Sequence, residues 1–150
     1  MNTLGFLWAG LAVGLGWIGA GFWEALIVAS AFNAILRNPD LRGKFMVYMI
    51  LFVALDESVA IYWLIVAFQI VGMDPSAMLN PHALVAAWLA VWLPGLAVGI
   101  WEWYLAKVSV ENMGKNPELS GFYMILTILW MALVESAAIY GLIIAFQLLG

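Results

Sequence analysis

The stretch that decides the fold is residues 45–71, which read FMVYMILFVALDESVAIYWLIVAFQIV. A helix needs roughly 20 mainly apolar residues to cross the hydrocarbon core of a membrane. This run exceeds that length and contains only two charged side chains, Asp56 and Glu57. A carboxylate inside such a run is costly, so it indicates a functional site by default.

Three similar apolar runs complete the chain, at about 4–35, 83–110 and 122–149. The polar breaks between the runs contain proline, which ends helices. With 67% hydrophobic and 9% charged residues, the chain is unlike a soluble domain, in which about a quarter of residues are charged. We therefore predict an all-α integral membrane protein with four transmembrane helices in two tandem hairpins, 1–72 and 82–150, joined by an extracytoplasmic linker, 73–81.

Several classes of protein are excluded. Cysteine is absent, so there is neither a disulfide framework nor a thiolate metal site. No basic region or cleavage motif precedes the first apolar run, so no cleaved signal peptide is expected. The chain contains no phosphate-binding loop, and we expect no nucleotide site, no resident cofactor and no nucleic-acid partner.

The positive charges predict the orientation in the cell membrane. All five lie in the loops inside the predicted hairpins or within three turns of them: Arg37, Arg42, Lys44, Lys107 and Lys115. Cytoplasmic loops carry the excess of Lys and Arg in membrane proteins. We therefore expect both hairpin loops in the cytoplasm, with the termini and the linker outside.

The chain contains a direct repeat. Residues 22–72 align without gaps on 100–150, and 22 of the 51 pairs are identical. Glycines that recur through the first and third runs indicate close helix packing.

Within the repeat, identity is concentrated on one helix face. Seven residues of the second run recur in the fourth: Ala54, Glu57, Ser58, Ile61, Tyr62, Ile65 and Gln69. The differences between 54–69 and 132–147 fall at 56, 59, 63 and 66, which form one helical stripe. We expect this stripe to face lipid. Asp56, whose counterpart is Val134, either tunes the first site or, as we expect, faces a neighbour or the lipid interface.

The remaining buried acids form pairs. Glu24 lies 15 residues before Pro39 and Glu57 lies 18 after it, so both are some 25 Å from the loop along antiparallel helices. Glu102 and Glu135 repeat this spacing around the second loop. Two facing carboxylates in hydrocarbon cannot both stay ionised, so each pair is expected to share a proton or to bind a cation.

Hydroxyl groups accompany these acids. Ser58 and Tyr62 add oxygens beside Glu57, a set that suits a small hard cation such as Na⁺. The alternative is that protonated glutamates only hydrogen-bond the helices together. The duplication of the arrangement favours ion binding.

Two motifs occur in both halves of the chain. The polar loops read Arg37-Asn38-Pro39-Asp40 and Lys115-Asn116-Pro117-Glu118, and the acid-bearing helices read ALDESVAIY at 54–62 and ALVESAAIY at 132–140. Together these motifs resemble the c subunit of rotary ATP synthases and, in their fused form, the proteolipids of the V and A types.

The resemblance implies two ion sites of the two-carboxylate type. Their side chains would be Glu24, Glu57, Ser58 and Tyr62 in one site, and Glu102, Glu135, Ser136 and Tyr140 in the other. The carbonyl ligands would come from Leu55 and Leu133. Val59 and Ala137 stand where sodium-binding members have a threonine, which is a departure from the pattern.

The function implied is that of a non-catalytic rotor-ring subunit, which carries Na⁺ or H⁺ on buried glutamates. Its partners would be identical subunits in the ring, membrane lipid, a stator subunit that supplies an arginine, and a central stalk. The stalk would contact Arg37, Asn38, Pro39, Lys115, Asn116 and Pro117. The alternatives are a small ion-coupled transporter that uses the same glutamates and a purely structural membrane scaffold. The duplicated buried acids argue against the scaffold.

Overall fold

The computed structural model describes residues 3–74 and 80–150, and these residues form four long helices with a short 3₁₀ turn inside each hairpin. The elements are α1 Thr3–Arg37, η1 Pro39–Leu41, α2 Arg42–Gly72, α3 Pro81–Lys115, η3 Pro117–Leu119 and α4 Ser120–Leu149. Each long helix is long and apolar enough to cross a membrane. The predicted all-α fold is confirmed. The predicted linker, 73–81, falls partly on residues 75–79, which lie outside the described residues.

The two hairpin turns are built alike. Asn38 and Asn116 precede prolines, and a residue before proline is pushed out of the helical region, so helices α1 and α3 end there. A backbone hydrogen bond from Leu41 to the Asn38 carbonyl, 3.0 Å long, closes the first turn. Leu119 closes the second in the same way on Asn116, at 3.1 Å.

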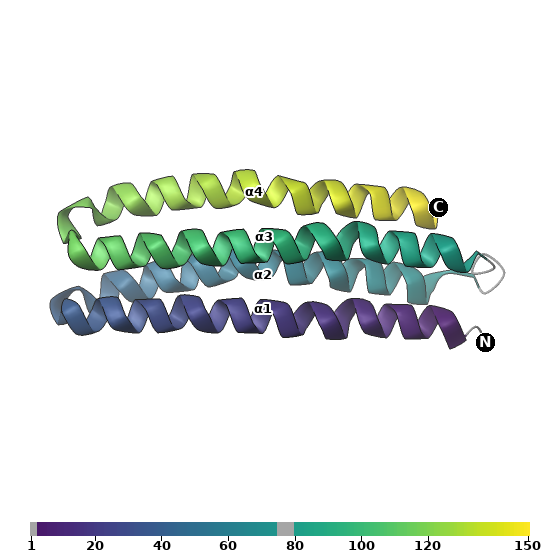
Figure 1. The fold of residues 1–150 in the computed structure, drawn as a ribbon, viewed down its shortest axis with the longest axis horizontal. Helices are drawn as coiled ribbons and strands as arrows, with labels where there is room; N and C mark the ends of the chain where they lie inside the picture. The colour runs from purple at the N-terminus through teal and green to yellow at the C-terminus, as the bar shows by residue number, and fades with distance from the viewer. Residues whose placement is uncertain (1–2, 75–79) are drawn as a thin grey trace.

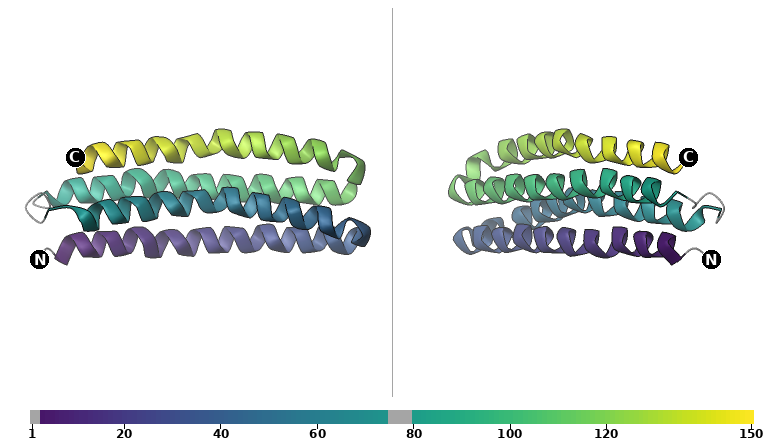
Figure 2. Two further views of the ribbon diagram at one scale, coloured as in Figure 1. Left: turned by 180° about the vertical axis from the view of Figure 1, so that it is seen from behind. Right: turned by 45° about the vertical axis from the view of Figure 1, so that its right-hand side comes forward.

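The helices run side by side along the long axis, with both hairpin turns at one end and both termini at the other (Figure 1). Helices α1 and α4 lie on opposite sides of the bundle in every view (Figure 2). Helices α2 and α3 lie between them, and each packs against all three other long helices. The interface between the hairpins is therefore made by α3 packing on α1 and α2, with a smaller contribution from α2 packing on α4.

The stripe of α2 that diverges from its repeat is buried in this interface. Asp56, Val59, Trp63 and Val66 are between 0% and 2% exposed. The prediction that this stripe faces lipid is therefore wrong for the first hairpin. On α4 the counterparts Ala137 and Ile144 are exposed, because α4 lies at the edge of the bundle.

Trp63 is buried between the two hairpins, in the half of the bundle that lies towards the termini. Its indole nitrogen donates a hydrogen bond of 3.1 Å to the Val91 carbonyl on α3. A Cβ atom added to Gly95 would lie 2.7 Å from that nitrogen, and one added to Gly16 would collide with the same ring. The predicted close packing at glycines is thus confirmed at these two positions, where glycine makes room for the indole.

Replacing Gly16 with alanine should lower the thermal stability of the purified protein. The added methyl group must displace Trp63, and overpacking of this kind costs about 1–3 kcal/mol. The loss of helical circular dichroism on heating in detergent measures the effect. Gly43→Ala is the matched control, since a Cβ at Gly43 has no neighbour within 4 Å. Equal melting temperatures for the two variants would contradict this account of Gly16.

Candidate ion-binding site

A polar site joins the two hairpins in the middle of the bundle. Ser58 Oγ and the Tyr62 hydroxyl, both on α2, each donate a hydrogen bond of 2.5 Å to Glu135 Oε1 on α4. Ser58 and Tyr62 are four residues apart, so they lie on one face of the helix. Two hydroxyl donors from one hairpin thus converge on a single carboxyl oxygen of the other.

This pairing differs from the expected one. The sequence places Ser58 and Tyr62 beside Glu57, their neighbour on α2. In the structure Glu57 is exposed and both hydroxyl groups serve the second hairpin instead. The reason is that α2 and α4 run side by side, so the face of α2 that carries the hydroxyls meets α4.

Glu102 completes this site from α3. Its side chain is fully buried and lies close enough to Glu135 and Asp56 for their charges to act on it. Neither of its carboxyl oxygens has a hydrogen-bond partner among the described residues. Leu55 lies one helical turn before Ser58 on α2 and is half-buried. The site therefore offers buried oxygens that are free to bind a cation or a proton.

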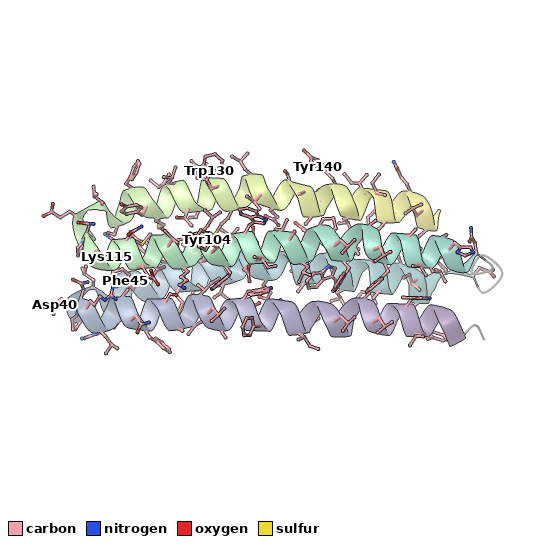
Figure 3. The ribbon with its side chains drawn as sticks, in the orientation of Figure 1. Asp40, Phe45, Tyr104, Lys115, Trp130 and Tyr140 are labelled. Atoms are coloured by element: carbon pink, nitrogen blue, oxygen red, sulfur yellow. The ribbon has the colours of Figure 1, made fainter. Side chains whose placement is uncertain are left out.

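The other predicted site residues are divided between the two edges of the molecule. Glu24 is half-buried on α1, within electrostatic reach of Glu57. Tyr140 on α4 is 64% exposed and points away from the bundle (Figure 3). Ser136 donates 2.7 Å to the carbonyl of Leu133 on its own helix. Glu24 and Glu57 thus act on each other through their charges, and among the described residues no hydroxyl of α4 is hydrogen-bonded to either of them.

Coordination by acidic side chains alone does not fit this arrangement. Among the described residues, no three His, Cys, Asp or Glu side chains are placed to hold a metal ion together. A cation here would be bound by a mixture of carboxyl, hydroxyl and carbonyl oxygens, as suits a small hard monovalent ion.

The hairpin turns gather the predicted stalk-contact residues at one end. Arg37, Pro39, Lys115 and Asn116 are exposed, and Asn38 and Pro117 are half-buried. Figure 3 shows Asp40 and Lys115 at this end of the bundle. The Asn38 side chain donates a hydrogen bond of 2.5 Å to the Gly114 carbonyl, which ties the first turn to the end of α3.

Asp56 faces the neighbouring hairpin, which is one of the positions expected for it, and not the lipid interface. It is 1% exposed, and it lies within electrostatic reach of Glu24 and Glu102, away from lipid. The signal that could have placed it is the stripe it shares with Trp63, since a large aromatic side chain in that stripe needs a packing partner.

Comparison with known proteins gives the same architecture. A model of the family described as the C subunit of ATP synthase matches residues 7–70 and again 85–148. The ATP synthase c subunit of Chloroflexus aurantiacus is 41% identical over 70 residues, which cover 47% of this chain and 92% of that protein. The corresponding protein of Dehalococcoides mccartyi is 40% identical over the same length and the same shares.

A relative that this chain matches over both hairpins is also known. The K subunit of the A-type ATP synthase of Methanocaldococcus jannaschii is 32% identical over 146 residues, which cover 97% of this chain and 61% of that protein. The family match occurs twice in this chain, and each copy spans one helical hairpin of membrane length. This multi-pass membrane protein belongs to the c-subunit family of ATP synthases and contains two copies of the family's unit.

Proposed function

We propose that this chain is a rotor-ring subunit of an ion-translocating ATP synthase or ATPase, and that it carries Na⁺ on its buried glutamates. The observation that supports this most strongly is the hydrogen-bonding of Glu135 by Ser58 and Tyr62 across the hairpins. When one acid of the pair is protonated, the other, held by hydroxyl donors from a neighbouring hairpin, can take up a cation, cross lipid in neutral form and release it.

The same contact explains why copies would assemble into a ring. The chain uses the hydroxyls of its first hairpin and the acid pair of its second. Within the described part of the chain, this leaves Glu24 and Glu57 without hydroxyl donors at one edge, and Ser136 and Tyr140 without an acid at the other. A second copy placed by the same relation supplies what is missing. A head-to-tail interface of this kind closes into a ring if the rotation closes.

Other positions that are covered between the two hairpins have counterparts that are uncovered at the edges of the molecule. Trp23 packs on Gly99 and stacks on Trp103, with ring centroids 5.5 Å apart. Its counterpart Trp101 is 60% exposed, and a Cβ on Gly21, the counterpart of Gly99, has no neighbour within 4 Å. A neighbouring copy would cover these open positions.

The oxygen set supports Na⁺ as the ion. A proton needs only a pair of carboxyls, whereas the hydroxyls of Ser58 and Tyr62 beside Glu102 and Glu135 provide several hard oxygens in one place. Val59 carries no hydroxyl, so any further ligand comes from backbone or water.

The surroundings of the ring follow from charge. The basic residues near the two turns favour a cytoplasmic position for these turns, where a central stalk would rest on them. A stator subunit would supply an arginine, whose positive charge releases the ion from each glutamate pair as it passes.

Assembly is the first test. Native mass spectrometry of the protein in mild detergent should give a large homo-oligomer, and top-view electron microscopy images should show a closed ring. The open acid edge and hydroxyl edge are the physical reason. A dimer would favour a small ion-coupled transporter that uses the same glutamates, and a monomer would remove both interpretations.

Topology is the second. A cysteine introduced at Asp40 or Glu118 should stay unlabelled by a membrane-impermeant maleimide added to intact cells, because the turns face the cytoplasm. Labelling should appear once the cells are opened. A cysteine at the exposed His82, near the opposite end, is the positive control. Labelling of the turns from outside would reverse the orientation.

The third test separates the two ion sites. A carbodiimide modifies protonated carboxyls in apolar surroundings, and bound Na⁺ should protect Glu135 and Glu57 from it. Ser58→Ala should raise the half-protecting Na⁺ concentration at Glu135 about tenfold, since it removes a hydrogen bond to a charged group. Ser136→Ala should do the same at Glu57 only.

The decisive result is that each serine variant weakens Na⁺ protection of the glutamate on the other hairpin and not of the glutamate next to it in sequence. Peptide mass spectrometry after labelling measures each glutamate separately in the same sample. A Ser58→Ala variant that weakens protection of Glu57 and leaves Glu135 unchanged would mean that each site is built inside one hairpin. Modification that ignores Na⁺ in the unchanged protein and falls as pH rises would mean that the ring carries protons.

A further inference from the structure

Asp56 is a buried acid that belongs to neither of the two expected ligand sets. Its side chain is 1% exposed, and neither carboxyl oxygen has a hydrogen-bond partner among the described residues. Glu102, the fully buried acid of the site inside the chain, is in the same condition. Burying a carboxyl group without a partner is costly, in an apolar segment above all. Two such groups in one interface indicate that this region holds a cation or protons that the protein alone does not provide.

The position of Asp56 places it against α3. Its Oδ1 atom is 3.9 Å from the point that a Cβ on Gly99 would occupy, and Gly99 lies one turn before Glu102. Trp23 of α1 lies against the same point, with its Cδ1 atom 3.2 Å from it. Asp56 therefore lies inside the interface between the hairpins, at the level of the ion site.

The charged groups around Asp56 come from every neighbouring helix. Glu24 of α1 and Glu102 of α3 are both within electrostatic reach of it. Glu135 of α4 acts on Glu102 in turn, while Glu57, the next residue on α2, is exposed. No lysine or arginine is hydrogen-bonded or ion-paired with Asp56 in the described part of the chain. The negative charge must therefore be balanced by a bound cation or proton.

The other site of the repeat has no such acid. The counterpart of Asp56 is Val134, which is half-buried on α4 in an apolar hollow of about 360 Å³ lined also by Pro94, Val98 and Trp101. Asp56 lies beside Gly99, and the counterparts of these two residues in the repeat are Val134 and Gly21. If neighbouring copies pack as the two hairpins of one chain do, Val134 of one copy would lie beside Gly21 of the next. The site between copies thus has a valine where the site inside the chain has a third carboxyl.

We propose that Asp56 is a buried acid beside the ion site inside the chain and strengthens cation binding there, so that the ring alternates two unequal classes of site. This inference depends on the proposed ring function. No three acids of the described residues are placed to hold one metal ion together, so Asp56 acts from beside the Glu102–Glu135 pair and not as a third acid on the ion. An extra carboxyl oxygen near Glu102 strengthens cation binding at the Glu102–Glu135 site. The site formed by Glu24 and Glu57 with the next copy binds the same cation more weakly.

The test uses the repeat to supply matched variants. Asp56→Val gives the first hairpin the residue of the second, and Val134→Asp does the reverse. In the assembled protein at fixed pH, carbodiimide labelling of Glu135 and Glu57 is followed by peptide mass spectrometry as Na⁺ is increased. The unchanged protein should show two protection curves about tenfold apart, with Glu135 protected at the lower Na⁺ concentration.

The variants should move these curves in opposite ways. Asp56→Val should shift the Glu135 curve onto that of Glu57 and leave Glu57 unchanged, and Val134→Asp should shift Glu57 towards Glu135. Asp56→Asn, which keeps an oxygen but removes the charge, should fall between the unchanged protein and Asp56→Val. Curves that coincide in the unchanged protein, or an Asp56→Val variant that keeps the separation or moves only Glu57, would overturn the proposal.

Failure of the proposed ion is distinguished within the same experiment. If Na⁺ protects neither glutamate of the unchanged protein, the choice of Na⁺ is wrong and labelling rates without Na⁺ are compared. Unequal rates at Glu135 and Glu57 that become equal in Asp56→Val would still support two classes of site. Equal rates in the unchanged protein would exclude them. If Asp56→Val does not assemble, Val134→Asp gives an independent answer from the other half of the repeat.

Discussion

A carboxylate inside hydrocarbon must find its hydrogen-bond donors within the protein, and this constraint governs the structure. Glu135 finds them on another hairpin, because Ser58 and Tyr62 on α2 both donate to it. The contact fixes the depth at which α2 and α4 face each other. It also fixes which side of α2 is turned towards α4, and therefore which side is left for α1 and α3. The burial of Asp56 and Trp63 in the interface follows from that rotation.

Separating donors from acceptors in this way makes each hairpin incomplete. Each hairpin has hydroxyl groups on one side and an acid pair on the other. Within the chain, the hydroxyls of the first hairpin bond an acid of the second, and the reverse pairing is not made in the described structure. Tyr140 remains 64% exposed and Glu57 remains without a hydroxyl partner in the described structure. In a bilayer, where lipid cannot donate to a carboxylate, these groups strongly favour a protein partner of the same design. The chemistry of the site and the symmetry of the proposed assembly therefore have one physical origin.

The sequence predicts the elements well and the pairing less well. Apolar runs of membrane length and the Asn-Pro breaks define four helices, and the structure has them. The acids could be found because charge in such runs is rare. Which hydroxyl serves which acid could not be found, because Ser58 is adjacent to Glu57 in sequence while its partner, Glu135, lies 77 residues away. The lipid assignment of the diverging stripe is wrong for a related reason. Divergence between repeats suggests weak constraint, whereas here it marks an interface.

A fused double hairpin allows the contact between its own two hairpins to differ from the contact between neighbouring copies. In a ring of identical single hairpins, every contact between neighbours must be the same. In this chain, contacts inside the chain alternate with contacts between copies, and the two kinds are free to differ. All four positions that differ between 54–69 and 132–147 are buried on α2, where the hairpins of one chain meet. Trp63 fills space left by Gly16 and Gly95 there, whereas its counterpart Gly141 packs tightly on the Ala90 backbone of its own hairpin. Duplication followed by change at these positions converts one repeated interface into two, and Asp56 extends that difference to the ion site itself.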